Sequence, residues 1–300
     1  NGTLYVARFD ADGSGEWLAL TPDAMTQAGD QTLAAALGLA ADDLAGIIIN
    51  TCDAADLVGA TPMDRPEWGA VDPVSGDVYM TLTNNSDRTA EGTGPTYTNG
   101  GSSVEEAGVG FGSAPVNAAN PRAENAHGQV IRWREPSPGQ TTFDWDIFVF
   151  GALPDSDESE NLSGLTAQNY FSSCDGLWYD DRGDGNGILW IETDTGGTDF
   201  TNDQVLAVIP SSVGKASGDA AVIDAADQAQ LKRFAVGPNG CEVTGIFATP
   251  DKTALFINIQ HPGNWPASDS DDATAETTGT VRPRASTVVI QKSDGGQIAV

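Results

Sequence analysis

Short runs of alternating apolar and polar residues, separated by turns rich in Gly, Asp, Asn and Pro, make up most of this chain. The runs are rich in Val, Ile, Thr, Phe and Trp, and this composition and period are typical of strands with one buried face. Three segments repeat one order, in which an acidic residue leads into a strand, a tight turn and a second strand. These segments are residues 67–85, 175–195 and 242–262, with second strands expected at 78–83, 188–193 and 255–260.

Two further strand-like runs follow each repeat, so the unit contains four antiparallel strands. Units of this kind are the blades of a β-propeller, and closed propellers have about 4–8 of them. A hairpin at residues 4–9 and 15–20 fits the last two strands of a preceding blade. We therefore expect an all-β fold, a single β-propeller domain over residues 1–300 with about three and a half blades, which would be part of a larger propeller. The further runs are residues 129–134 and 142–150, 204–209 and 231–236, and 287–292 and 297–300.

Two segments between the strand runs have helical character. Residues 32–44 are rich in Ala and Leu and follow Asp30, which can cap a helix N-terminus. Residues 220–231 are a second candidate helix. The helices belong to insertions at residues 21–58 and 210–230, and we expect both to pack against the sheets rather than to carry function.

The long connections are expected to lie on one face. In an up-and-down blade, the start of the first strand and the end of the second lie on the same side, as do the connections between blades. Residues 85–127, 151–173 and 261–286 all fall there, and they greatly exceed the usual connection length of ~4–6 residues. Long loops on one face of a rigid scaffold indicate the active face.

The chain carries a formal net charge of -29, from 43 acidic and 14 basic residues. Such a surplus repels nucleic acid and anionic membranes, so neither is an expected partner. Acidic residues in this number indicate a salt-adapted surface or a set of cation sites. The sequence contains no apolar run of 18 residues and begins in what reads as a strand, so we expect a fragment without a transmembrane helix or a signal peptide.

The segment Arg65-Pro66-Glu67-Trp68 offers the clearest chemistry in the sequence. A guanidinium and a carboxylate two residues apart in an extended segment project to the same side. One short strand can therefore present an anion clamp and a metal ligand together, which indicates phosphate chemistry. The alternative is a plain surface ion pair, in which Arg65 binds Asp64 or Glu67.

The longer run from Gly59 to Gly69 resembles the PhoX-type alkaline phosphatases, which are secreted, calcium- and iron-dependent enzymes that remove phosphate from organic monoesters. The resemblance covers nearly the whole chain, and its motifs occur in the family's order. It implies a phosphomonoester hydrolase with Ca²⁺ and Fe³⁺ as cofactors and small-molecule phosphomonoesters as substrates. It also implies a periplasmic or extracellular protein, which we expect to be a monomer. The other similar stretches are Asn84-Asn85, Ala119-Asn120-Pro121-Arg122, Cys174-Asp175-Gly176-Leu177-Trp178, Gly240-Cys241-Glu242-Val243-Thr244-Gly245, Asn258-Ile259-Gln260-His261-Pro262-Gly263 and Arg282-Pro283-Arg284.

Five residues make up the expected site. The resemblance implies that Arg65 clamps phosphoryl oxygens and that Glu67 is a metal ligand. Asp175 and Glu242 begin the corresponding strands of the second and third repeats, where each is either a calcium or cluster ligand or a residue that accepts backbone N–H bonds. His261 lies at the end of the second strand of the third repeat, where it would donate to a phosphate oxygen or stabilise its loop. Converging carboxylates of this kind repel one another unless cations neutralise them.

Two features depart from the family's pattern. Cys52 and Asp53 stand where relatives are expected to carry an arginine and an apolar residue. The family also keeps further iron and calcium ligands in an upstream segment, so this chain would correspond to the C-terminal half. Converging carboxylates suit two other functions: a calcium-dependent lactonase-like propeller, which would not need Arg65, and a non-catalytic propeller fragment stabilised by calcium.

Overall fold

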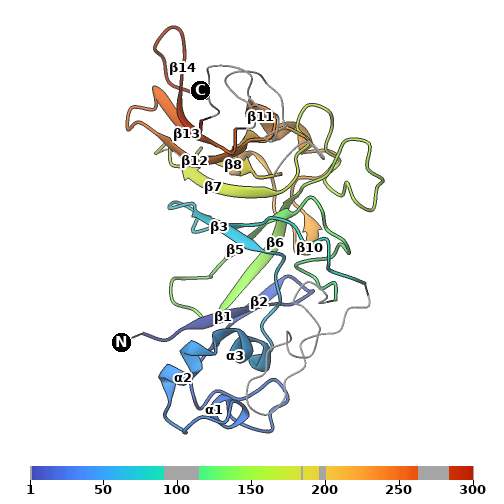
Figure 1. The fold of residues 1–300 in the computed structure, drawn as a ribbon, viewed down its shortest axis with the longest axis vertical. Coiled ribbons are helices and arrows are strands. Elements are labelled where there is room, and N and C mark those ends of the chain that lie inside the picture. The colour runs from blue at the N-terminus through green and yellow to red at the C-terminus, as the bar shows by residue number, and fades with distance from the viewer. Residues whose placement is uncertain (1, 91–114, 184, 196–200, 263–283, 300) are drawn as a thin grey trace.

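The computed structural model describes residues 2–90, 115–183, 185–195, 201–262 and 284–299. Parts of two expected long connections and most of the motif at 282–284 lie outside these residues. The described residues form three sheets, built almost wholly from antiparallel strands, with a small group of helices beside the first sheet (Figure 1). This arrangement confirms the expected all-β, propeller-like fold.

The first sheet has the strand order β1-β2-β6-β5-β4-β3, and β10 pairs with β6 beside this path. The N-terminal hairpin therefore extends this sheet, and its expected place in a preceding blade is wrong. Ser14 pairs with Asp144 of β6, and Trp145 Nε1 donates to the Ser14 carbonyl at 3.0 Å. The rings of Phe9 and Phe143 lie 5.0 Å apart and close the core between hairpin and sheet. The strands are β1 (Tyr5–Phe9), β2 (Ser14–Ala19), β3 (Pro66–Val71), β4 (Val78–Leu82), β5 (Gln129–Arg134), β6 (Thr142–Phe150) and β10 (Gly218–Ala221).

The second sheet has the order β11-β9-β8-β7 and the third has the order β12-β13-β14. Most of their strands begin and end within one residue of the predicted bounds. The described residues of the expected last strand, 297–299, form no strand; the Ile298 side chain is buried in the core of the third sheet, and its N–H donates to the Lys252 carbonyl at 2.8 Å. The strands are β7 (Cys174–Asp180), β8 (Ile188–Thr193), β9 (Gln204–Val208), β11 (Lys232–Val236), β12 (Glu242–Ala248), β13 (Ala254–Gln260) and β14 (Ser286–Gln291).

The first insertion contains three short helices in place of the single helix expected over residues 32–44. Thr32 rather than Asp30 caps the first of them, because Thr32 Oγ1 accepts a hydrogen bond from the Ala35 N–H at 3.3 Å. That helix soon ends because Gly38 adopts a left-handed conformation, with φ of 67°. No helix in the described part of the chain has the length and apolar character needed to cross a membrane. The helices are α1 (Leu33–Ala36), α2 (Leu44–Ile49) and α3 (Thr51–Val58).

The helix expected over residues 220–231 is wrong. The segment starts at the end of β10, and the Val222 N–H donates to the Ile147 carbonyl of β6 at 2.8 Å. Only Gln228–Gln230 forms a short 3-10 turn. Pairing with the edge of β6 thus outweighs the helical propensity of the alanines in this segment.

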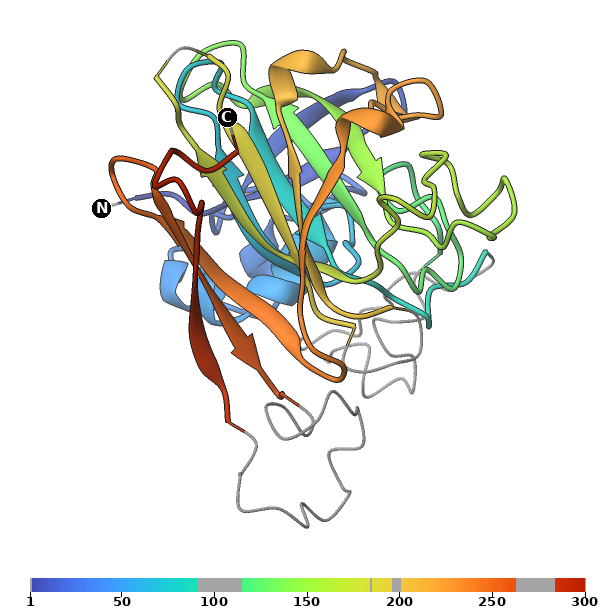
Figure 2. The ribbon, with the colours of Figure 1, turned by 90° about the horizontal axis from the view of Figure 1, so that it is seen from above.

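The three sheets stack one after another, with the second between the first and the third (Figures 1 and 2). Among the first strands of the repeats, β7 lies against both β3 and β12. Each is antiparallel to the second strand of its own repeat, so its start lies beside the end of β4, β8 or β13. Thr81 Oγ1 donates to the Asp175 carbonyl at 2.7 Å and links β4 to β7. These strand ends meet at the face where the long connections also begin or end, and this face holds the candidate site.

Candidate phosphate and metal site

A β-bulge interrupts the first strand of every repeat close to its start. A bulge inserts one extra residue and re-aims the neighbouring side chains, and bulges are common next to active sites. Glu67 and Asp175 both lie within such a bulge, at the strand ends that meet on the candidate face. The bulges fall between Pro66 and Gly69 in β3, between Cys174 and Leu177 in β7, and between Thr244 and Phe247 in β12.

Three carboxylates converge here from different elements. One oxygen atom from each of Asp175, Asp194 and Glu242 lies within 4.8 Å of the other two. The pKa of Asp175 is raised to about 6, mainly by burial and then by the charges of its acidic neighbours, Glu67 first among them. The positive charge of Arg65 opposes this shift. Repulsion of this kind is what a bound cation relieves.

Glu192 of β8 adds a further buried acid to this region, with 1% of its surface exposed. Its pKa is raised to about 8, mainly by burial, with contributions from the charges of Asp175 and Glu242, while a hydrogen bond from the Ile246 backbone lowers it. Its Oε1 finds no hydrogen-bond partner within the described ranges. A β-carbon at Gly176 would meet Glu192 Oε2 at 2.3 Å, so any larger residue there would displace this carboxylate. The clustered oxygens of Asp175, Asp194 and Glu242 fit a hard cation, and Glu192 adds a buried carboxylate near them.

Arg65 precedes β3 and presents a side chain that is 59% exposed. Its Nη1 donates to Asn84 Oδ1 at 2.8 Å, and its Nη2 lies 3.8 Å from Glu67 Oε1. Asn84 Nδ2 in turn donates to Ser173 Oγ at 3.1 Å, which ties the arginine to the strand start of the second repeat. The guanidinium is therefore oriented by its neighbours while much of it stays accessible to an anion.

His261 follows β13 at the outer edge of the acidic cluster, with 75% of its side chain exposed. Its Nε2 lies 3.8 Å from Glu242 Oε2, and Gln260 Nε2 donates to the same oxygen. An imidazole at this place can donate a proton to Glu242 or to a ligand that binds beside it.

A sequence model of the family described as alkaline phosphatase PhoX matches residues 1–263. The chain belongs to this PhoX family. Among solved structures it is similar to Pseudomonas fluorescens PhoX in complex with vanadate, a transition state analogue, with 34% sequence identity and a TM-score of 0.70. That match covers 99% of this chain and 46% of the other, so the chain spans about half the length of its solved relative. Comparison with curated proteins gives no match.

All five residues singled out in this PhoX-family sequence lie in one region. Arg65 and Glu67 come from the start of β3, Asp175 from β7 and Glu242 from β12, and His261 follows β13. The charges of Arg65, Glu67 and Glu242 all act on Asp175, and His261 Nε2 lies 3.8 Å from Glu242. Their roles as phosphate-binding residues or metal ligands stay predictions.

Sequence reasoning missed Asp194 and Glu192 as site residues. Asp194 directly follows β8, the same place in its repeat that Asn84 and His261 occupy near the ends of their strands, and this correspondence could have identified it. Glu192 lies inside a strand that is buried throughout, so nothing local distinguishes it from a structural residue. The PhoX family is metal-dependent, and both residues enlarge the acidic region that could hold metal.

Proposed function

We propose that the protein containing this chain hydrolyses small phosphomonoesters and releases inorganic phosphate. The observation that carries the proposal is the convergence of Asp175, Asp194 and Glu242 within 4.8 Å, in the neighbourhood of Arg65. Carboxylates that bind metal, beside a guanidinium that binds phosphate, are the parts that phosphoryl transfer requires. Membership of the PhoX family supports this, as does the vanadate complex of the Pseudomonas fluorescens relative.

Four carboxylates would hold the metal ions. They are Asp175, Asp194 and Glu242, together with Glu67, which raises the pKa of Asp175 and therefore lies close to it. Oxygen ligands suit the Ca²⁺ and Fe³⁺ that the family resemblance implies. When bound, such ions supply Lewis-acid stabilisation of phosphoryl oxygens. The carboxylates themselves fix where that positive charge is available.

Arg65 would bind the phosphoryl oxygens. Asn84 orients the guanidinium through the 2.8 Å hydrogen bond to Nη1, and the exposed remainder can donate to the negative charge that the transition state spreads over these oxygens. His261 would act at the edge of the same site, where its imidazole can donate a proton to a phosphate or leaving-group oxygen.

The setting of the reaction is part of the proposal. We place the protein in the periplasm or outside the cell, as a monomer whose three sheets are successive blades of one propeller domain. The net charge of -29 disfavours nucleic acid and anionic membranes as partners. Small esters that enter from solvent are the substrates that an exposed Arg65 can reach.

The test is to compare full-length wild-type protein with Arg65→Ala in hydrolysis of p-nitrophenyl phosphate, with elemental analysis of both. We expect kcat/KM to fall about 10²- to 10³-fold, as for the loss of one transition-state donor, with calcium and iron content unchanged. Arg8→Ala is the matched control, because Arg8 pairs with Asp10 and Glu16 on the N-terminal hairpin. Hydrolysis of a lactone without phosphatase activity, or full turnover by Arg65→Ala, would contradict the proposal.

A further inference from the structure

Arg65 has an unusual backbone conformation for a residue with a side chain. Its φ of 48° lies in the left-handed region, which non-glycine residues rarely adopt. Such a conformation persists only where the surrounding structure fixes it, and it is common at functional sites. Behind Arg65, its carbonyl accepts from the Thr83 N–H at 3.1 Å, which connects it to the end of β4. The residues that precede Arg65 in the sequence supply the remaining constraint on its backbone conformation.

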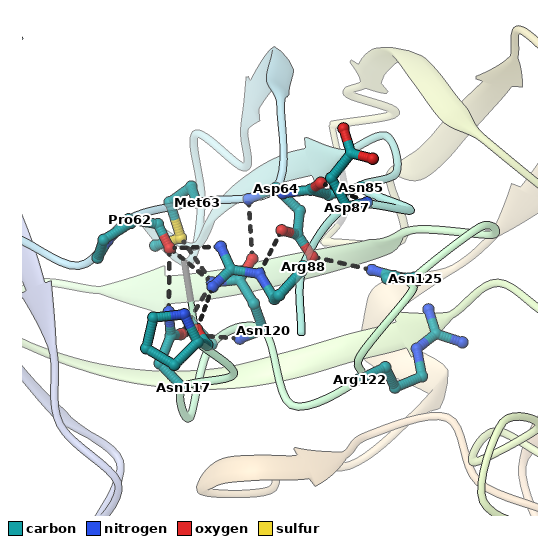
Figure 3. Close-up of polar contacts among 12 residues, drawn as sticks. Pro62, Met63, Asp64, Asn85, Asp87, Arg88, Asn117, Asn120, Arg122 and Asn125 are labelled. Carbon is teal, nitrogen blue, oxygen red and sulfur yellow. Dashed lines mark hydrogen bonds and ion pairs between the residues drawn. The ribbon is translucent and has the colours of Figure 1, made fainter. Parts of the chain in front are cut away.

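Asp64, the residue directly before Arg65, is fully buried. Its Oδ1 accepts from Arg88 Nε at 2.6 Å and its Oδ2 accepts from Asn125 Nδ2 at 3.1 Å. Its N–H donates to Asn120 Oδ1 at 2.9 Å, so backbone and side chain are both fixed (Figure 3). Because both carboxylate oxygens are occupied within the protein, Asp64 orients the chain rather than binding a ligand.

Arg88 holds this segment at more than one point. It is 1% exposed, its Nε binds Asp64, its Nη2 donates to the Pro62 carbonyl at 3.1 Å, and its Nη1 donates to the Pro115 carbonyl. One rigid guanidinium thus binds the chain on both sides of Met63, in the segment that leads into Arg65 (Figure 3). A lysine keeps the charge but cannot reproduce this planar fork.

The buried Arg88–Asp64 ion pair is better explained by its effect on local geometry than by a contribution to the free energy of unfolding. Moving two charges out of water carries a penalty that their mutual attraction repays only in part, and apolar residues of similar volume often stabilise a core as well or better. What the Arg88–Asp64 pair supplies is a fixed position for the residues that lead into Arg65. None of the Arg88 side-chain partners named above is a candidate metal ligand.

We propose that Arg88 is a positioning residue for Arg65 and that it acts through Asp64. The proposal rests on the proposed function, in which Arg65 binds phosphate. Loss of the Arg88 fork lets the segment before Arg65 relax, so the guanidinium no longer meets the phosphoryl oxygens in its productive orientation. The metal ions, held by carboxylates of other strands, stay in place.

The test is a double-mutant cycle on full-length, metal-loaded protein. Arg88→Lys is made alone and combined with Arg65→Ala, and inorganic phosphate is the probe, through its inhibition constant. We expect Arg88→Lys to weaken phosphate binding about 10-fold, since a displacement of about 1 Å in such a site can cost up to ~10²-fold. Calcium and iron content should not change, and Arg88→Lys should cost nothing further once Arg65 is alanine. An equal loss in both backgrounds overturns the proposal.

A matched control separates positioning from general destabilisation. Arg132 and Asp146 form another buried pair, with Arg132 Nε at 3.0 Å from Asp146 Oδ1, in the middle of β5 and β6. Arg132→Lys should lower the melting temperature and leave phosphate binding unchanged. If it weakens phosphate binding as much as Arg88→Lys does, the effect is not specific and the proposal fails. Asp64→Asn serves as the second variant should Arg88→Lys not fold.

Hydrogen exchange at the Thr83 amide tests the structural step without catalysis. This N–H donates to the Arg65 carbonyl, so its exchange should speed up in Arg88→Lys and not in Arg132→Lys. Unchanged exchange overturns the proposal. If Arg65→Ala leaves phosphate affinity intact, the proposed function fails instead, while exchange at Thr83 still decides whether Arg88 holds the Arg65 backbone.

Discussion

Two groups of buried or half-buried carboxylates, at opposite ends of the sheets, are balanced in opposite ways. At the site end, Asp175, Asp194 and Glu242 converge, and no Lys or Arg of the described residues lies within ion-pair distance of them. At the other end, where β7 finishes, Asp180 is fully buried and bound by both Arg182 and Lys252. The carboxylate of Asp180 is neutralised by cations of the chain, whereas those of Asp175, Asp194 and Glu242 repel one another.

This difference separates carboxylates with a structural role from carboxylates that are candidate metal ligands. An acid that the fold needs comes with partners from the chain: Asp77 pairs with Arg134 at the start of β4, and buried Asp203 accepts from the hydroxyls of Thr193 and Thr195. Acids that share a site without such partners add to one another's pKa: burial is the main cause of the pKa of about 6 for Asp175, and the charges of Glu67, Asp194 and Glu242 raise it further. A strongly acidic composition alone does not separate the two cases, whereas pairing does.

Replacement of Asp180 should have the largest effect on stability. Asp180→Asn keeps the shape and removes the charge, which leaves Arg182 and Lys252 without their buried partner. We expect the free energy of unfolding to fall by about 3 kcal/mol, at the lower end for breaking a buried pair because both cations keep some exposure. Urea unfolding measures this loss. It should be the same with and without chelator, and a dependence on metal would contradict the comparison.

The same substitution at the other end should have the opposite sign. In metal-free protein, Asp175→Asn removes a charge that burial disfavours and that Glu67, Asp194 and Glu242 repel. It should raise the free energy of unfolding by roughly 1 kcal/mol after allowance for the partly exposed position. In metal-loaded protein it removes a candidate ligand, so melting should shift to lower temperature. Thermal unfolding with and without EDTA measures both arms. Destabilisation of the metal-free form would show that Asp175 is structural.

Local strand patterns could be predicted from the sequence, and pairing between distant segments could not. The runs 129–134, 142–150 and 188–193 coincide with β5, β6 and β8, because the content of β-branched and aromatic residues is set by each strand's own sequence. Attachment of the hairpin to β6 depends on contacts between Ser14 and Asp144, which no local pattern encodes. The alanines after Gly218 led to the wrong prediction of a helix for the same reason. Local propensity does not register that the free edge of β6 is available for pairing.

The residues of the candidate site also fall into those that a local motif reveals and those that only the fold brings together. Arg65 and Glu67 stand two residues apart, so one short motif revealed them. Asp194 comes close to Asp175 and Glu242 only because three strand ends meet, and in the sequence only its place in the repeat, shared with Asn84 and His261, points to it. The left-handed φ of Arg65 and its support by Arg88 were equally hidden, because Arg88 follows Asp64, the residue whose carboxylate it binds, by 24 positions.

The smallest effect concerns His127, at the site end of β5. Its Nε2 lies 3.2 Å from Glu160 Oε1 and its Nδ1 lies 2.9 Å from Ser172 Oγ. Burial lowers its pKa below 6.5, and the charge of Arg122 adds to this shift while that of Glu160 opposes it. The imidazole is then neutral at physiological pH, so it adds no cation to the site end and the contrast with Asp180 holds.

The pH dependence of unfolding tests this. Below pH 6.5 the unfolded chain takes up a proton that folded His127 resists, so this residue's contribution to stability is complete above 6.5 and is lost as the pH falls toward the lower folded pKa. His127→Gln removes the titration and keeps hydrogen-bonding capacity toward Ser172 and Glu160. Urea unfolding of both proteins at pH 8 and pH 5.5 should show a smaller loss toward acid in the variant. A larger loss in the variant would mean that His127 is charged and paired with Glu160, which would add a cation to the site end.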